Sequence, residues 1–167
     1  MAAEPVRAVL ALGANLGDAP ATVEAAIGAL DRLPSTRLIT RSSLYRTAPV
    51  GYADQPDFIN AVAVVETALA PRALLDALLE LERTQGRTRT FANAPRTLDL
   101  DILLYGSQTV QEPGLTIPHA RLHERAFVLV PLVEIAPETD IPGYGCAADL
   151  VRGLDTSGIK RIAQAAV

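Results

Sequence analysis

The sequence is poor in several residues that mark particular protein classes. Cysteine occurs once, as Cys146, which excludes an internal disulfide and a cysteine-rich zinc site and favours a reducing compartment. Tryptophan is absent and aromatic residues make up 4% of the chain, so the core must be aliphatic. Neither an 18-residue apolar run nor a charged and apolar leader is present, and we therefore expect a soluble, cytoplasmic protein without membrane partners.

Excess positive charge is also absent. The formal net charge is -4, which argues against broad nucleic-acid binding, because that binding needs a basic face to meet phosphates. Lysine occurs once, as Lys160, against 14 arginines, a bias that genome-wide codon usage explains. The glycine-rich motifs G-x-x-x-x-G-K-[ST] and G-x-G-x-x-G are missing, which excludes a standard P-loop or protein-kinase fold.

The order of predicted elements indicates the fold class. A length of 167 residues suits a single domain, spanning 1–167. Strands are predicted over 6–12, 37–46, 58–67 and the second half of 95–106, and helices over 20–33, 71–86 and 123–137. Up to residue 106 this order is β-α-β followed by β-α-β, which predicts an α+β, ferredoxin-like βαββαβ core with C-terminal elaborations.

Local signals support the two helices of this core. Asp18 is a suitable cap for the first helix and Pro34 ends it. The second helix starts at Pro71 and ends before Gly86. Its apolar side is predicted to consist of five leucines: Leu74, Leu75, Leu78, Leu79 and Leu81.

The segment "PRTLDLDILLYG", residues 95–106, places two aspartates in an otherwise apolar run. In a strand, Asp99 and Asp101 share one face, and Leu98, Leu100 and Ile102 take the other. Two carboxylates about 7 Å apart repel each other unless a cation or separate partners neutralise them. Magnesium, which prefers carboxylate oxygen, fits this pair. The alternative is a strand with one solvent-exposed face, whose aspartates form salt bridges with surface arginines.

A cluster of arginines precedes the aspartate strand. Arg83, Arg87, Arg89 and Arg96 fall within 14 residues that contain no acidic residue. Guanidinium groups bind phosphate oxygens in pairs, so arginines facing a carboxylate-bound magnesium predict a polyphosphate clamp suited to phosphoryl transfer. A solvated loop that forms salt bridges to the aspartates is the alternative.

His119 and His123 are four residues apart and could share a zinc ion on a helix. No third ligand is evident in the sequence. We therefore prefer hydrogen bonds from His119 to phosphate.

Taken with its neighbours, the aspartate segment resembles the 6-hydroxymethyl-7,8-dihydropterin pyrophosphokinase family of folate biosynthesis. Other segments that resemble this family, in the same order, are "LGANLGD" at 12–18, "SSLYRTAPVG" at 42–51, "QPDFINAV" at 55–62 and "LTIPHARLHERAFVLVPLVEIAPE" at 115–138. The resemblance implies transfer of pyrophosphate from ATP to the pterin hydroxymethyl group, with release of AMP. It also implies two Mg²⁺ ions as cofactors and small molecules as the partners, and we expect a monomer.

The resemblance further implies roles for individual residues. The catalytic residues are Arg87, Arg96, Asp99 and Asp101, of which Asp99 and Asp101 bind the metal ions. The ATP-binding residues are Glu82, Arg87, Arg89, Arg96, Ile102, Tyr105, Thr116, His119 and Arg125. The pterin-binding residues are Thr47, Ala48, Pro49, Val50, Gly51, Phe58, Asn60 and Phe127. Asn60 also suggests a polar partner by itself, because an amide inside an apolar strand is a poor core residue.

Three positions depart from the family pattern. A tryptophan that many members carry before the Pro-Arg pair is missing, and Phe91 is the candidate replacement in a loop that we expect to act as an ATP-ordered lid. Gly114 stands where a basic residue is frequent, and Leu79 where a polar one sometimes occurs. Two rival interpretations remain: a catalytically silent relative that only binds its ligands, and a ferredoxin-like RNA-binding module.

Overall fold

The computed structural model describes residues 4–15, 18–47, 57–85 and 98–162. Within these residues the main sheet has six strands. Its order is β10 (Ile159–Arg161), β3 (Tyr45–Thr47), β4 (Phe58–Thr67), β1 (Val6–Ala14) and β5 (Asp99–Tyr105), with β2 (Thr36–Arg41) also paired to β4. Every pair in this sheet is antiparallel, and helices accompany it, which confirms the α+β class.

One face of the sheet packs against two helices, α1 (Ala19–Leu30) and α2 (Pro71–Gln85). Strand β1 alternates its side chains, so Ala8, Leu10 and Leu12 enter this aliphatic core and the residues between them face the other way. Asp18 caps α1, because its carboxylate accepts a hydrogen bond from the Ala21 backbone at 3.3 Å. The two predicted helices 20–33 and 71–86 are thus confirmed as α1 and α2, although α1 ends three residues before Leu33.

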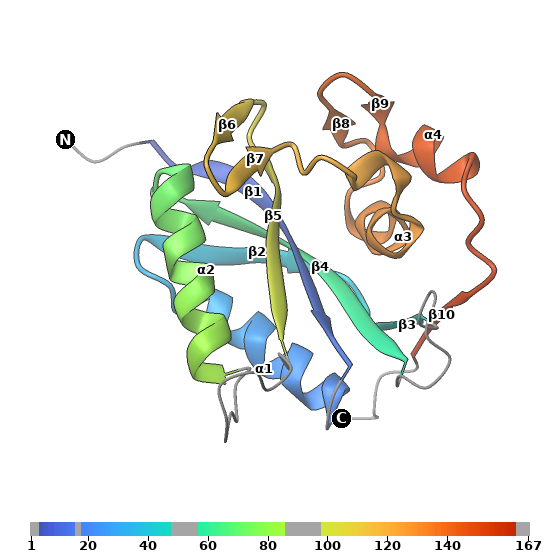
Figure 1. Ribbon diagram of the computed structural model, residues 1–167, viewed down its shortest axis with the longest axis horizontal. Helices are drawn as coiled ribbons and strands as arrows, with labels where there is room; N and C mark the ends of the chain where they lie inside the picture. Colours follow the sequence, from blue (N-terminus) through green and yellow to red (C-terminus); the bar gives the residue numbers. More distant parts are fainter. Residues whose placement is uncertain (1–3, 16–17, 48–56, 86–97, 163–167) are drawn as a thin grey trace.

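In the described part of the chain, two other helices pack on the opposite face of the sheet. Helix α3 (Ala126–Ile135) packs on β1, β4 and β5 together with α4 (Ala147–Arg152), and these helices lie side by side, apart from α1 and α2 (Figure 1). The short helix η1 (Leu122–Glu124) leads into α3. Hairpins β6 (Val110–Glu112) with β7 (Leu115–Ile117), and β8 (Asp140–Ile141) with β9 (Gly145–Cys146), complete the described elements.

The predicted strand 37–46 is divided in two by Ser42. The Ser42 hydroxyl accepts a hydrogen bond from the Val62 backbone at 2.9 Å, a position that a backbone carbonyl would otherwise take in the ladder. The chain leaves β4 there and returns to it as β3. Ser42 is 1% exposed, so this side-chain bond is buried and replaces one bond of the ladder.

Two further expectations need correction. Leu79 does not belong to the apolar side of α2: it is 45% exposed, whereas Leu74, Leu78 and Leu81 are buried. The predicted helix 123–137 is interrupted at Arg125, whose extended backbone (φ -101°, ψ 96°) separates η1 from α3. Among the described residues, none of the helices is both long enough and apolar enough to span a membrane.

Candidate active site

The strand register places the predicted residues in one row across the sheet. Gly13 of β1 is paired with Asn60 of β4 on one side and with Asp99 of β5 on the other. We call Asn60, Gly13 and Asp99 the Gly13 row. Because neighbouring strands lie about 4.8 Å apart, the backbones of Asn60 and Asp99 are separated by about 10 Å. The next row on the same face pairs Ala11 with Asp101.

The centre of the Gly13 row is open because Gly13 has no side chain. A Cβ atom at this position would lie 3.0 Å from the Asn60 amide nitrogen, closer than ordinary van der Waals contact. The glycine therefore makes room for the Asn60 amide and leaves a flat floor between the amide and the aspartate. The sequence analysis did not identify Gly13 as a site residue, because the predicted strand 6–12 stopped one residue before it, whereas β1 continues to Ala14.

The two aspartates share one face of β5, as predicted. Both line a cavity of about 820 Å³, whereas Leu100 and Ile102 enter the core on the opposite face; Leu98 belongs to that core and also borders the cavity. The strand is held from that core side by Glu82 of α2, which is 3% exposed and accepts a hydrogen bond from the Leu100 backbone at 2.7 Å. The backbone between the carboxylates is thus fixed by a buried contact.

A bulge ends this alternation. Val9 pairs with Leu104 and Leu10 pairs with Ile102, so Leu103 is an extra residue and Tyr105 turns to the core face. The Tyr105 hydroxyl donates a hydrogen bond to the Leu69 carbonyl at 2.6 Å. The side chains of Glu82, Ile102 and Tyr105, which the resemblance assigned to ATP, therefore lie on the core face of β5 and do not line the cavity.

The 820 Å³ cavity gathers most of the predicted site residues that the structure describes. They come from β3, β4, β5 and the start of α3, and are Thr47, Phe58, Asn60, Asp99, Asp101, Arg125 and Phe127. The Arg125 guanidinium lies over the Phe127 ring, 5.7 Å from its centroid, so it is held near the apolar wall of the cavity. Ala48 to Gly51, Arg87, Arg89, Phe91 and Arg96 lie outside the described residues.

Two polar atoms of this cavity are buried without a hydrogen-bond partner among the described residues. They are Thr47 Oγ1 and Asn60 Oδ1. An unpaired buried oxygen costs on the order of 1–3 kcal/mol, so such atoms are retained where a ligand or water completes them. Both atoms belong to residues predicted to bind the pterin, and they sit at the end of the cavity away from the aspartates.

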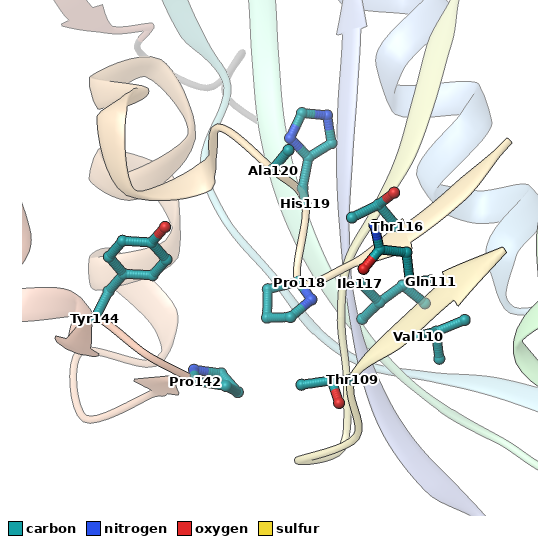
Figure 2. A pocket seen from close by; sticks show the side chains of 10 residues that line it. All are labelled: Thr109, Val110, Gln111, Thr116, Ile117, Pro118, His119, Ala120, Pro142 and Tyr144. Carbon is teal, nitrogen blue, oxygen red and sulfur yellow. The ribbon is translucent and has the colours of Figure 1, made fainter. Parts of the chain in front are cut away.

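His119 and Thr116 line a smaller cavity of about 340 Å³ (Figure 2). The His119 backbone donates a hydrogen bond to the Leu103 carbonyl of β5 at 3.0 Å, so this cavity lies beside the aspartate strand. Burial lowers the pKa of His119, although the negative charge of Asp101 acts in the opposite direction. The neutral ring accepts a hydrogen bond from the Arg121 backbone at Nδ1, 3.2 Å away. Its proton therefore resides on Nε2, which can donate to an anionic oxygen.

The same histidine does not form a zinc site with His123. His119 precedes η1, and the His123 ring stacks on Tyr144 with centroids 3.8 Å apart and planes 8° from parallel. The described part of the chain contains no cluster of three or more histidine, cysteine or acidic residues arranged to hold a metal ion. Among the described residues, Asp99 and Asp101 are the carboxylates of β5 that a cation at this face would meet.

The cavity also has walls that the sequence analysis left without a role. Residues 155 and 157–159, just before and at the start of β10, line it, and so do Arg121 and Glu124 of the segment before α3. Strand β10 reaches this place because Ile159 pairs with Thr47. A three-residue strand in a weakly patterned tail carries no periodic signal that sequence reasoning could use.

Comparison with known proteins agrees with this geometry. The model of the family described as 7,8-dihydro-6-hydroxymethylpterin-pyrophosphokinase (HPPK) matches residues 9–137. The 2-amino-4-hydroxy-6-hydroxymethyldihydropteridine pyrophosphokinase of Pseudomonas aeruginosa is 46% identical over 156 residues, which cover 93% of this chain and 96% of the relative. The protein of the same name from Haemophilus influenzae is 47% identical, covering 88% and 92%.

A solved structure shares the fold. A triple mutant of HPPK-DHPS from Plasmodium falciparum superposes with a TM-score of 0.74 at 17% identity, covering 90% of this chain. The chain spans 44% of the length of that protein. This likeness concerns the fold alone.

The family match and the named relatives identify a transferase that acts on phosphorus-containing groups, and the acidic face of β5 is consistent with that class. The chain belongs to the 7,8-dihydro-6-hydroxymethylpterin-pyrophosphokinase family and is a pyrophosphokinase of folate biosynthesis, as the resemblance predicted.

Proposed function

We propose that the 820 Å³ cavity is the site at which the pyrophosphoryl group of ATP passes to the hydroxymethyl oxygen of 6-hydroxymethyl-7,8-dihydropterin. One observation carries this assignment: the Gly13 row sets the Asn60 amide oxygen, which has no partner among the described residues, and the Asp99 carboxylate on one floor, with their backbones about 10 Å apart. A pterin held at Asn60 can therefore present its hydroxymethyl group over Gly13, toward phosphates held near Asp99 and Asp101.

Asp99 and Asp101 are suitable ligands for magnesium. They share one face, line one cavity, and offer only carboxylate oxygens, which suits a cation that keeps several waters and binds substrate phosphates. Asp99 and Asp101 would hold two Mg²⁺ ions between them. When bound, the metal ions supply charge neutralisation at the triphosphate and help to orient the attacking hydroxyl.

The nucleotide would lie along β5 toward the smaller cavity. His119, with its proton on Nε2, donates to a phosphate oxygen, and Arg125 offers a fixed guanidinium from the other side. Thr116 lies in the smaller cavity beside His119, where it can contact the nucleoside. Arg87, Arg89 and Arg96 complete the arginine clamp in this proposal, and Arg87 and Arg96 act as catalytic residues.

For Glu82, Ile102 and Tyr105 we propose a supporting role in ATP binding, since their contacts on the core face fix the position of the aspartate strand β5.

The pterin would lie between Phe58 of β4 and Phe127 of α3, which face the same cavity. Stacking between two rings favours a flat heterocycle, and hydrogen bonds to Asn60 and Thr47 select its polar edge. The backbone of residues 48–51 would contribute further bonds to that edge. The unpartnered oxygens of Thr47 and Asn60 support this placement.

The chemistry needs positioning rather than a protein nucleophile. The hydroxymethyl oxygen attacks the β-phosphorus and forms a new P–O bond. The bond from the β-phosphorus to the oxygen that bridges it to the α-phosphorus breaks, and AMP leaves with that oxygen and the electron pair. The hydroxyl proton passes to solvent. His119 and Arg125 hold the phosphate oxygens while the negative charge redistributes.

The remaining assignments concern the whole chain. We propose that residues 1–167 form one domain, and that its core is ferredoxin-like, an assignment supported by the fully antiparallel order β5-β1-β4-β3. We also propose that the protein is a cytoplasmic monomer whose ligands are small molecules.

The test of this function is an assay with ATP, Mg²⁺ and hydroxymethyl-dihydropterin. We expect AMP release that requires both the pterin and the metal. AMP release independent of the pterin would contradict the proposed acceptor. Binding of both ligands without AMP release would instead support a silent relative.

A further inference from the structure

The carboxylate of Glu134 on α3 has contacts that the proposed reaction does not use. It accepts hydrogen bonds from the Ser43 backbone at 2.9 Å, the Ser43 hydroxyl at 2.7 Å and the Tyr45 hydroxyl at 2.8 Å. The Arg161 guanidinium lies 3.6 Å from the same carboxylate. One side chain of α3 therefore joins the start of β3 and the last strand, β10.

Each of these three elements supplies a wall of the 820 Å³ cavity. On α3, Phe127 lies seven residues before Glu134, so both side chains lie on the same side of the helix, about 10 Å apart along its axis. On β3, Tyr45 contacts Glu134, and Thr47, two residues further along the strand, lines the cavity. On β10, Ile159 lines the cavity and pairs with Thr47.

Strand β3 is in turn registered on the floor of the cavity. Tyr45 pairs with Asn60, and Thr47 pairs with Phe58. The distance between α3 and β3 therefore determines the width of the slot between Phe127 on the helix and Phe58 on the sheet. Aliphatic contacts hold α3 on the sheet, but such contacts are not directional and do not set its height or rotation.

We propose that Glu134 is a positioning residue for the pterin: its carboxylate fixes α3 relative to β3 and so sets the spacing of the two aromatic rings. This inference rests on the proposed pterin site. The two residues that donate these hydrogen bonds to Glu134 are nearly inaccessible to solvent: Ser43 is 4% and Tyr45 is 7% exposed. Loss of the carboxylate would leave buried donors unpaired, and the helix would move to satisfy them.

The ionisation of the cluster is consistent with a fixed, charged Glu134. Burial and the bond to Glu134 raise the pKa of Tyr45 to about 12, so its hydroxyl remains a donor at neutral pH. Burial acts to raise the pKa of Glu134, but the hydrogen bonds from Ser43 and Tyr45 outweigh it and the pKa is lowered.

The test compares steady-state constants of Glu134→Ala with those of the wild-type enzyme. We expect KM for the pterin to rise about tenfold, with KM for ATP and kcat within about twofold, because only the ring slot changes. Glu134→Gln keeps an acceptor oxygen for Ser43 and should restore part of the pterin affinity. Ser43→Ala and Tyr45→Phe each remove one donor and should give smaller increases in the same constant.

Glu24→Ala is the matched control. Glu24 forms two hydrogen bonds with Arg41, at 2.6 and 2.8 Å, and joins α1 to β2 away from the cavity. Its loss should lower the unfolding temperature without changing KM for the pterin. A general loss of stability would therefore be distinguished from a change in the slot.

An unchanged KM for the pterin in a folded Glu134→Ala protein would overturn the inference. If that variant does not fold, unchanged values in both Ser43→Ala and Tyr45→Phe would overturn it equally. Phe127→Leu separates this result from failure of the pterin site itself. If Phe127→Leu raises KM for the pterin and the Glu134 variants do not, only the positioning role is wrong. If Phe127→Leu also has no effect, the proposed pterin site is wrong.

Discussion

The two faces of the sheet are made by the same strands but differ in composition and in what they do. On the face covered by α1 and α2, alternate residues of β1, β4 and β5 are aliphatic and closely packed. On the opposite face the same strands present Gly13, Asn60, Asp99 and Asp101, and α3 covers only part of the sheet. Stability is concentrated on the first face and chemistry on the second.

This difference teaches how a small enzyme can carry groups that are unfavourable in a folded protein. Thr47 and Asn60 each bury an oxygen without a partner among the described residues, and Asp99 and Asp101 place two negative charges near each other. They are tolerated because the strands that carry them are anchored from behind by the leucine-rich core and by the buried contact of Glu82 with the Leu100 backbone. Substitutions on the two faces should therefore have separable effects.

The largest expected effect is that of Asp99→Asn or Asp101→Asn. Each change should reduce kcat/KM by at least about 100-fold, because metal ions contribute several kcal/mol to the transition state. The unfolding temperature should change little, since neither aspartate belongs to the core. Asp149→Asn is the control, because its ion pair with Arg152 is exposed and neither residue lines the cavity. Wild-type turnover in either aspartate variant would show that the aspartates are not needed for the reaction, and would contradict the assignment of the chemistry to this face.

A core substitution should give the converse result. Leu78 is fully buried on α2, and Leu78→Ala should lower the free energy of unfolding by about 2–5 kcal/mol. Urea unfolding measures this loss. At a temperature where the variant remains folded, kcat/KM should stay within about twofold of the wild-type value. A large loss of turnover in the folded protein would show that the faces are coupled.

Gly13→Ala tests the floor of the cavity. The new methyl group would meet the Asn60 amide at 3.0 Å and push it away, so KM for the pterin should rise about tenfold with KM for ATP unchanged. Gly28→Ala is the matched control, because no atom lies within 4 Å of a Cβ atom there and helix stability should only increase. Equal behaviour of the two variants would show that the open centre of the Gly13 row is unimportant.

Tyr105→Phe tests whether the Tyr105 hydroxyl stabilises the core face or contacts the nucleotide directly. Its hydroxyl donates a hydrogen bond to the Leu69 carbonyl at 2.6 Å on the core face, so the free energy of unfolding should fall by about 1 kcal/mol, and KM for ATP, which Tyr105 supports only indirectly, should rise less than about twofold. Calorimetric unfolding and steady-state kinetics measure these two quantities. A clear rise in KM for ATP without loss of stability would place Tyr105 in direct contact with the nucleotide.

The smallest expected effect is on the pH dependence of stability. The pKa of Glu134 is lowered in the folded protein, so its contribution is present above the unfolded value of 4.5 and is lost as the pH falls through the folded value. The difference in unfolding temperature between wild type and Glu134→Gln should therefore shrink below pH 4.5. A difference that stays constant down to pH 2.5, or grows, would show that ionisation of Glu134 is unimportant.

The sequence predicted the packed face better than the site. Aliphatic periodicity and an aspartate cap are local signals, and they identified the first helix, the second helix and the long strands. The face shared by Asp99 and Asp101 also follows from simple alternation. Leu79 was assigned wrongly because a helical period marks a side of the helix but not how far the neighbouring elements cover it.

Other features depend on contacts between distant segments, which no local pattern reveals. The division at Ser42 needs the Val62 backbone, and the rotation of Tyr105 needs an extra residue at Leu103. Gly13 gains its role only when Asn60 lies beside it. Strand β10 is recognisable only through its pairing with β3.

The most direct measurement is a crystal structure with Mg²⁺, a nonhydrolysable ATP analogue and hydroxymethyl-dihydropterin bound together. We predict metal ions about 2.1 Å from oxygens of Asp99 and Asp101, the pterin between Phe58 and Phe127, and its hydroxymethyl group above Gly13. Carboxylates engaged by protein cations, with the nucleotide and the metal bound elsewhere, would contradict the account.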